Sequence, residues 1–226
     1  MPASDRKAAI VKAALPLFAR QGFARTTTKD LARAAGVSEP LLYRHFPSKE
    51  ALYLEIQNHT CRDTDTISRQ LAELPPSTAT LVHLVYYLVR ALLLGQPTGP
   101  IDWDTRHRLM VTSFLEDGEF ARLLYRNRFD DYCLRIEACL EVATASGDAV
   151  ASPVSAANRA RLAHHAAAYV ALAQLPDKAV VEYQAEPREL LDQTMWFVLR
   201  GMGLTDRTIR RHYRPAQLEK FFADAP

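Results

Sequence analysis

Residues 30–49 read Asp-Leu-Ala-Arg-Ala-Ala-Gly-Val-Ser-Glu-Pro-Leu-Leu-Tyr-Arg-His-Phe-Pro-Ser-Lys, and this stretch decides the fold. It predicts two short helices separated by Gly36, because glycine ends a helix in the left-handed conformation at little steric cost. Ser38 is a good N-cap for the second helix, and Pro40 fits its first turn, where a missing N–H is tolerated. Helix, glycine turn and short helix form the pattern of a helix-turn-helix, whose second helix enters the major groove of DNA.

Helical patterns continue on both sides of this stretch. Thr27 is a suitable N-cap for the helix before the turn, with Asp30 three residues later as the acid of a capping box. No convincing strand pattern or internal repeat occurs, so we expect an all-α fold of about nine or ten helices. The other expected helices cover residues 5–21, 49–74, 81–94, 105–116, 119–145, 155–175 and 187–202, followed by a short amphipathic tail.

Length and composition limit the number of domains. The 226 residues, 48% of them hydrophobic, allow one large domain or a small and a medium domain. We expect a three-helix helix-turn-helix domain in residues 1–50 and a helical domain for effector binding and dimerisation in residues 51–226. No uncharged apolar run is long enough to cross a membrane, and the charged N-terminus lacks a signal core, so we expect a cytoplasmic protein. The three cysteines have no metal-type spacing and are expected to be reduced thiols.

Charge is unevenly distributed along the chain. Residues 1–50 contain nine Lys/Arg and four Asp/Glu, a net +5, whereas the remainder carries a net −3. A basic first segment that also carries a helix-turn-helix indicates a polyanionic partner.

Signatures of catalysis are missing from the sequence. It has no Gly-x-Ser-x-Gly elbow, no His-Glu-x-x-His motif and no glycine-rich phosphate loop. His164 and His165 are adjacent and point to different sides of a helix, which makes them a poor joint metal site. We therefore expect no enzyme activity, no cofactor and no metal.

The first quarter of the chain resembles the DNA-binding domain of the tetracycline-repressor (TetR) family of bacterial transcription regulators. The resemblance is dense over residues 6–55, and beyond them it is limited to length and helical architecture. The matching residues are Ala14, Leu17-Phe18, Gly22-Phe23, Thr27-Thr28, Asp30-Leu31-Ala32, Ala35-Gly36-Val37-Ser38, Leu42-Tyr43-Arg44-His45-Phe46 and Ser48-Lys49-Glu50-Ala51-Leu52.

The resemblance implies several contacts to DNA phosphates. Tyr43 matches a family tyrosine that donates to a phosphate, and His45 matches a neighbour often found at the DNA backbone. Thr28 and Lys29 match positions where the helix before the turn reaches the DNA. Lys49 lies at the start of the next helix, where its ammonium would favour a phosphate.

Base reading is expected from the exposed first turn of the second helix. Glu39 could accept a hydrogen bond from a cytosine amino group, and Arg44 could address guanine or a phosphate. Apolar residues there can contact thymine methyl groups. The predicted readers are Ser38, Glu39, Pro40, Leu41 and Arg44.

A second copy of the chain is expected because one recognition helix buries too little surface for useful affinity. Two helices near the C-terminus could form a four-helix bundle across a two-fold axis, although the same residues could instead form intramolecular core. The predicted interface residues are Ala163, Ala167, Val170, Ala171, Leu191, Thr194, Met195 and Val198.

A small-molecule effector is implied by the family resemblance, and its pocket is expected between residues 81 and 169. Arg90 is informative because a buried cation needs a partner, either a protein carboxylate or an anionic ligand. The candidate lining residues are Tyr86, Arg90, Trp103, Phe114, Tyr125 and Tyr169.

Together these features predict a homodimeric regulator that binds a palindromic double-stranded DNA operator. We expect a repressor that a small-molecule effector releases from its operator. A helical DNA-binding dimer without an effector is the alternative.

Overall fold

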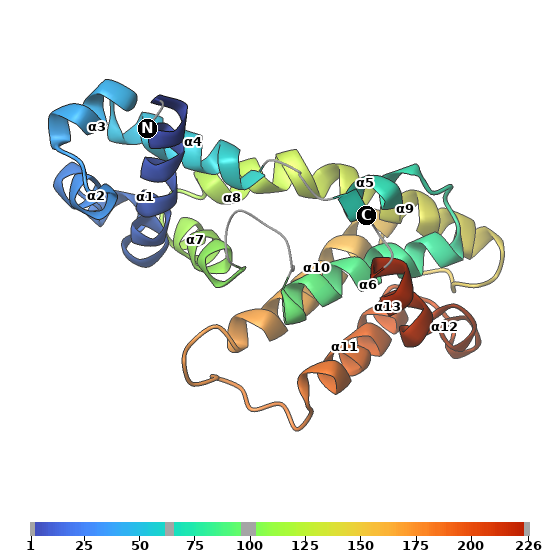
Figure 1. Ribbon diagram of the computed structural model, residues 1–226. Helices are drawn as coiled ribbons and strands as arrows, with labels where there is room; N and C mark the ends of the chain where they lie inside the picture. Colours follow the sequence, from blue (N-terminus) through green and yellow to red (C-terminus); the bar gives the residue numbers. More distant parts are fainter. Residues whose placement is uncertain (1–2, 62–65, 96–102, 224–226) are drawn as a thin grey trace. The chain divides into compact units, whose positions relative to one another are not determined.

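The computed structural model describes residues 3–61, 66–95 and 103–223, and within these ranges the regular structure is helical (Figure 1). The all-α prediction is confirmed, with one isolated bridge between Ala149 and Leu204 as the extended pairing among the described residues. The helices are α1 (Ala3–Arg25), α2 (Thr28–Ala35), α3 (Glu39–His45), α4 (Lys49–Cys61), α5 (Thr66–Glu73), α6 (Thr78–Leu94), α7 (Trp103–Leu115), α8 (Glu119–Leu124), the π-helix η1 (Tyr125–Phe129), α9 (Asp130–Ala145), α10 (Ala156–Ala173), α11 (Pro187–Gly201), α12 (Asp206–His212) and α13 (Pro215–Ala223).

Two of the expected helices are divided in the structure. The helix expected over residues 49–74 corresponds to α4 and α5, and residues 62–65 between them lie outside the described residues. The helix expected over residues 119–145 consists of α8, the π-helix and α9. The tail after residue 203 contains two helices, so the described residues hold more than the nine or ten helices expected.

The chain forms two compact units, which we call the head (residues 1–63 and 99–128) and the body (residues 64–98 and 129–226). In the head, α1 packs against α2, α4 and α7, and α8 packs against α4 and α7. The core of the head includes Phe18 of α1, Leu31 of α2, Leu42 of α3, Leu109 of α7 and Phe120 of α8, each at most 2% exposed. Burial of apolar side chains from all these helices holds the head together.

The head is larger than the helix-turn-helix alone. Residues 105–116 were expected in the ligand-binding part, but α7 buries Leu109 against the core of the head. The side chain of Thr112 donates a hydrogen bond to the carbonyl oxygen of Ala19 at 3.1 Å. The functional division at residue 50 stays a prediction, and the structure adds α7 and α8 to the unit that carries the helix-turn-helix.

In the body, α6 is the central helix and packs against α9, α10 and α11 (Figure 1). Leu81 and Leu84 of α6, Leu140 of α9, Ala167 of α10 and Met195 of α11 are at most 1% exposed. The nearly all-round apolar sequence of α6 therefore agrees with its position, since helices cover it on several sides.

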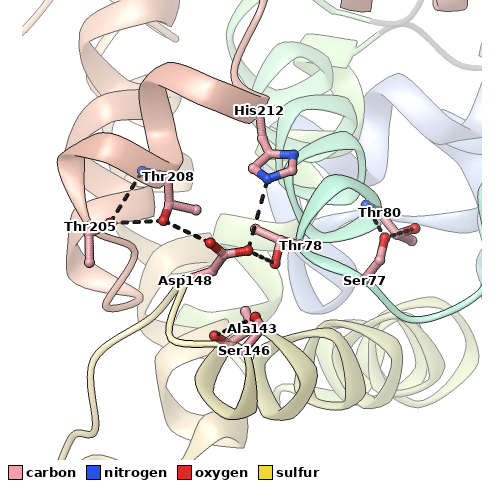
Figure 2. A network of polar contacts seen from close by, with 9 residues as sticks. All are labelled: Ser77, Thr78, Thr80, Ala143, Ser146, Asp148, Thr205, Thr208 and His212. Atoms are coloured by element: carbon pink, nitrogen blue, oxygen red, sulfur yellow. Dashed lines mark hydrogen bonds and ion pairs between the residues drawn. The ribbon is translucent and has the colours of Figure 1, made fainter.

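A polar network around Asp148 joins the start of α6 to α12 (Figure 2). Its carboxylate accepts hydrogen bonds from the hydroxyls of Thr78 at 2.8 Å and Thr208 at 3.3 Å. The ring of His212 lies 3.9 Å away. Burial lowers the pKa of His212, so this ring is neutral near pH 7. The hydrogen bond from Thr78 lowers the pKa of Asp148, which keeps the carboxylate ionised.

Among the described residues no helix combines the length and apolar character needed to span a lipid bilayer. Cys133 and Cys139 in α9 are buried and not joined in a disulfide, as expected, and the side chain of Cys61 lies outside the described residues. Burial raises the pKa of Cys133 to about 11, which disfavours a reactive thiolate.

Candidate nucleic-acid interface

The turn between α2 and α3 has the geometry that its sequence predicts. Gly36 adopts φ 63° and ψ 34°, a left-handed conformation, and its N–H group bonds to carbonyl oxygens at the end of α2. The N–H of Val37 donates to the carbonyl of Ala32 at 3.0 Å. The hydroxyl of Ser38 then accepts from the N–H of Leu41 at 3.3 Å and caps α3. These local bonds fix the angle at which α3 leaves the turn.

One face of α3 is buried and the other is open. Leu42 is 2% exposed and anchors α3 in the core of the head, while Leu41 is half-buried. Pro40, Tyr43 and Arg44 are exposed, and 45% of Tyr43 is accessible. The structure thus brings these three predicted contacts onto one accessible helix surface.

The predicted reader Glu39 already has a partner inside the helix-turn-helix. The hydroxyl of Thr28 donates to its carboxylate at 3.0 Å. This bond ties the first turn of α2 to the first turn of α3, so two predicted DNA contacts are adjacent. A carboxylate offers further acceptor sites, so base reading by Glu39 stays compatible with this bond. Lys29 next to Thr28 is exposed.

Lys49 has a different environment from the one expected. Its ammonium donates to the carbonyl oxygens of Phe23 at 2.9 Å and Thr26 at 3.1 Å, and it lies 4.2 Å from the centroid of the Phe23 ring. These contacts use two of its three donors to hold the end of α1 and the residues that lead into α2. The phosphate contact stays a prediction, and the structure supplies an internal role that the sequence did not indicate.

His45 lies at the end of α3 and is half-buried. Its Nε2 atom is buried, and it has no hydrogen-bond partner among the described residues. The ring of Phe46, the next residue, packs in the core and lies 5.4 Å from the ammonium of Lys7. A phosphate contact from His45 remains a prediction.

Glu116, which sequence reasoning missed, contacts the segment before the helix-turn-helix. Its carboxylate accepts a hydrogen bond from the N–H of Phe23 at 3.0 Å. Gly22 makes room for this contact, because a Cβ atom there would lie 2.0 Å from Oε1 of Glu116. Gly22 also has φ 77° and ψ 172°, a conformation that favours glycine. Glu116 therefore binds the backbone N–H of Phe23, and Lys49 binds the carbonyl oxygen of the same residue.

The six candidate ligand residues are divided between the two units, and their role in ligand binding stays a prediction. Tyr86 and Arg90 are neighbours on α6 in the body, where both contact Glu219. Phe114 in the head is 60% exposed, and Tyr169 on α10 is 69% exposed. The other two are Tyr125, half-buried in the π-helix, and Trp103, whose side chain lies outside the described residues.

The predicted interface residues on α11 are buried in the single chain, and their role in a dimer stays a prediction. Leu191, Thr194, Met195 and Val198 are at most 7% exposed within the single chain. They are buried because α11 packs against α6 and α10 in the same body.

On α10 the predicted interface residues have mixed positions. Ala167 is fully buried within the chain, whereas Ala163, Val170 and Ala171 are half-buried. Larger apolar side chains face outward on the same two helices. They are Leu162 and Tyr169 of α10, which are 59% and 69% exposed, and Phe197 of α11, which is 70% exposed.

The described residues contain no group of three or more His, Cys, Asp or Glu side chains placed to hold a metal ion. His164 and His165 lie on α10 as adjacent rings with centroids 5.4 Å apart.

Comparison with known proteins matches the helix-turn-helix segment to an established family. The model for "Bacterial regulatory proteins, tetR family" matches residues 10–56. The regulator EthR of Mycobacterium tuberculosis is 38% identical over 74 residues, which cover 33% of this chain and 34% of EthR. The repressor Rv3405c of the same species is 32% identical over 110 residues, which cover 44% of this chain and 58% of the repressor. The chain thus spans about a third to somewhat over half the length of these relatives.

A solved structure extends the similarity to both units. The crystal structure of a gamma-butyrolactone receptor (ArpA-like protein) is 25% identical, with a TM-score of 0.58. The match covers 98% of this chain and 99% of that one. Its architecture agrees with an N-terminal helix-turn-helix followed by a helical domain. The chain therefore resembles the TetR family of bacterial regulatory proteins, in sequence over its helix-turn-helix segment and in fold over both units.

Proposed function

We propose that the protein is a transcriptional regulator that binds duplex DNA with α3 in the major groove. The observation that carries this proposal is the two-sided character of α3. Leu42 fixes the helix to the head, while Pro40, Tyr43 and Arg44 remain accessible. A helix so presented can place side chains against base edges and phosphates.

Electrostatics support a polyanionic partner. The first 50 residues carry a net charge of +5 within a chain of net +2. Phosphate neutralisation by Lys and Arg dominates the affinity of DNA-binding proteins and makes it depend on salt. Lys29 and Arg44 are exposed near the two ends of the helix-turn-helix and are the cations best placed for this role.

Substitution of Arg44 by alanine tests this proposal. We expect Arg44→Ala to weaken binding of a selected operator about tenfold or more at physiological salt, since good base or phosphate contacts contribute about 1–3 kcal/mol. Arg20→Ala is the matched control, because it removes the same charge from an exposed position on α1. Fluorescence anisotropy with labelled duplexes measures both affinities. Equal losses of operator affinity in the two variants would mean that α3 has no special role in DNA binding.

The operator complex is proposed to contain a homodimer. The outer faces of α10 and α11 expose Leu162, Tyr169 and Phe197, which are large apolar side chains. Their burial against a second copy would remove this apolar surface from water. Two recognition helices related by a two-fold axis would then read a palindromic site.

The body is proposed to bind a small-molecule effector that releases the DNA, which makes the protein a repressor. Support comes from the similarity to a structure named as a gamma-butyrolactone receptor. Titration of small molecules into the operator complex, with release followed by anisotropy, tests this proposal. Binding of a ligand to the body without any change in DNA affinity would favour the alternative, a DNA-binding dimer without an effector.

A further inference from the structure

The C-terminal helix α13 places a carboxylate against two polar side chains of α6. Oε1 of Glu219 accepts a hydrogen bond from the hydroxyl of Tyr86 at 2.6 Å. The same oxygen lies 3.6 Å from Nε of Arg90. Tyr86 is 1% exposed, whereas the side chains of Arg90 and Glu219 retain about a quarter of their accessibility, 25% and 28%.

Arg90 is only partly satisfied by this pairing. Its Nε atom is buried, and the 3.6 Å separation from Glu219 is longer than a hydrogen bond. No other ion pair or hydrogen bond of Arg90 occurs among the described residues. A guanidinium carries five N–H donors in a planar fork that suits a carboxylate held by two bonds. Glu219 therefore lies at a site suited to an anion, but it does not make the two hydrogen bonds that Arg90 could donate to a carboxylate there.

Aromatic rings line the side of this site next to α13. The ring of Phe222 lies 5.5 Å from the ring of Tyr86 and 6.0 Å from that of Tyr87. The ring of Phe221 meets His83 edge-on at 5.0 Å. Phe222 follows Glu219 by three residues, so a carboxylate and an apolar group enter the body from one face of α13.

The attachment of α13 is weaker than that of α12. The first turn of α12 is held by the bond from Thr208 to Asp148, shown in Figure 2. The hydroxyl of Tyr213, at the end of α12, donates to Asp192 of α11. Beyond Tyr213 the printed sequence continues as Arg-Pro, and the backbone bonds of Gln217 and Leu218 run to Arg214 within the same segment. Among the described residues, side chains alone join α13 to the body, as expected of a segment that opens locally.

We propose that α13 is a displaceable cover over an anion site formed by Tyr86 and Arg90, and that this site binds a carboxylic acid with an apolar chain or ring. The carboxylate of the acid replaces that of Glu219, and its apolar part replaces Phe222. The proposal rests on the proposed function in one respect, that the bound acid then acts as an effector. Binding of the acid itself requires no DNA.

Calorimetric titration of sodium octanoate into the full-length protein without DNA tests the site. We expect Glu219→Gln to bind octanoate at least about fivefold more tightly than the wild type, because the competing charge is gone while the shape is kept. Glu182→Gln is the matched control, since Glu182 is exposed in the loop after α10. Glu182→Gln should bind octanoate with the affinity of the wild type. Neutral octanol should bind no variant more tightly than it binds the wild type.

Equal octanoate affinity in Glu219→Gln and the wild type would overturn the proposal, as would an absence of binding to both. Tyr86→Phe in the Glu219→Gln background keeps the ring but removes the donor. We expect it to weaken octanoate binding about tenfold, and an unchanged affinity would place the acid elsewhere.

Hydrogen exchange measured by mass spectrometry distinguishes displacement of α13 from binding at another site. Octanoate should accelerate exchange in residues 215–223 and leave residues 206–212 unchanged, because Asp148 and Asp192 hold α12. Binding of octanoate without faster exchange in α13 would contradict the proposal that the acid displaces this helix. These measurements contain no DNA, so a negative result with octanoate would not contradict the DNA-binding proposal. Equally, a failure to bind an operator would not contradict octanoate binding at this site.

Discussion

Glu39 brings a negative charge to a helix surface that otherwise carries Arg44 and lies near Lys29. Its bond from Thr28 orients the carboxylate at the start of α3. A carboxylate facing DNA accepts from a cytosine amino group and is repelled by phosphates and by base acceptors. Glu39 is therefore expected to act more on the choice of sequence than on total affinity.

Glu39→Ala should reduce the discrimination between the operator and its single-base variants about fivefold at the contacted position, as the loss of one base contact implies. Glu39→Gln removes the charge but keeps an oxygen that can accept from Thr28. Competition binding with the set of variant duplexes measures both effects. Unchanged preferences in Glu39→Ala would remove this residue from the readers.

Asp148 is expected to stabilise the body in a pH-dependent way. Hydrogen bonds from Thr78 and Thr208 lower its pKa in the folded state. A carboxyl group with a depressed folded pKa contributes stability above its unfolded pKa of about 3.9 and loses this contribution as the pH falls through the folded value.

Asp148→Asn should therefore lower the free energy of unfolding by about 1–2 kcal/mol at neutral pH, as expected for weakened hydrogen bonds to a charged group. The difference from the wild type should shrink below about pH 4. Urea unfolding followed by circular dichroism at both pH values measures it. Asp177→Asn, at an exposed position, is the control, and a difference that grows on acidification would contradict the assignment.

At the scale of elements, the helix-turn-helix was predictable because local signals determine it. The caps by Thr27 and Ser38, the left-handed Gly36 and the exit of the chain at Phe46 follow from neighbouring residues, and the structure confirms each of them. The contact of Glu116 with Phe23 joins residues 93 positions apart, and no short-range pattern indicates it. The one sequence feature related to this contact is Gly22, and a glycine at that position is compatible with many other roles.

The contact of Glu116, the residue after α7, with Phe23 near the end of α1 should stabilise the head. Gly22→Ala forces a side chain into φ 77° and displaces the Glu116 carboxylate. We expect a loss of about 2 kcal/mol, from left-handed strain and the lost hydrogen bond together. Denaturant unfolding of the full-length protein measures the change.

Glu116→Ala provides the comparison for this prediction. It should cost about 1 kcal/mol alone, and in its background Gly22→Ala should cost less than in the wild type, because the shared bond is already absent. Strictly additive losses would show that the two residues act independently.

At the scale of the whole molecule, the sequence indicated which helices are amphipathic but not what covers them. The apolar stripe of α11 that contains Leu191, Met195 and Val198 has the spacing of either a core or a dimer face. The structure places it against α6, and Phe197 on the other side of α11 is 70% exposed. The sequence also did not indicate the partner of Arg90, because Glu219 is distant from it along the chain.

Phe197→Glu should convert the proposed dimer into monomers, because it places a charge in the proposed interface. Phe114→Glu is the matched control, since Phe114 is 60% exposed on α7 in the head. Light scattering coupled to size-exclusion chromatography measures the mass. A dimer that persists in Phe197→Glu, or dissociates equally in both variants, would exclude this face.

Selection of bound duplexes from a random DNA pool by the wild-type protein tests the central claim most directly. Two copies of α3 related by a two-fold axis should enrich an inverted repeat whose half-sites are about 34 Å apart, one turn of the DNA helix, or a multiple of this distance. Enrichment of a single unrepeated half-site, or no enrichment over the starting pool, would contradict the account.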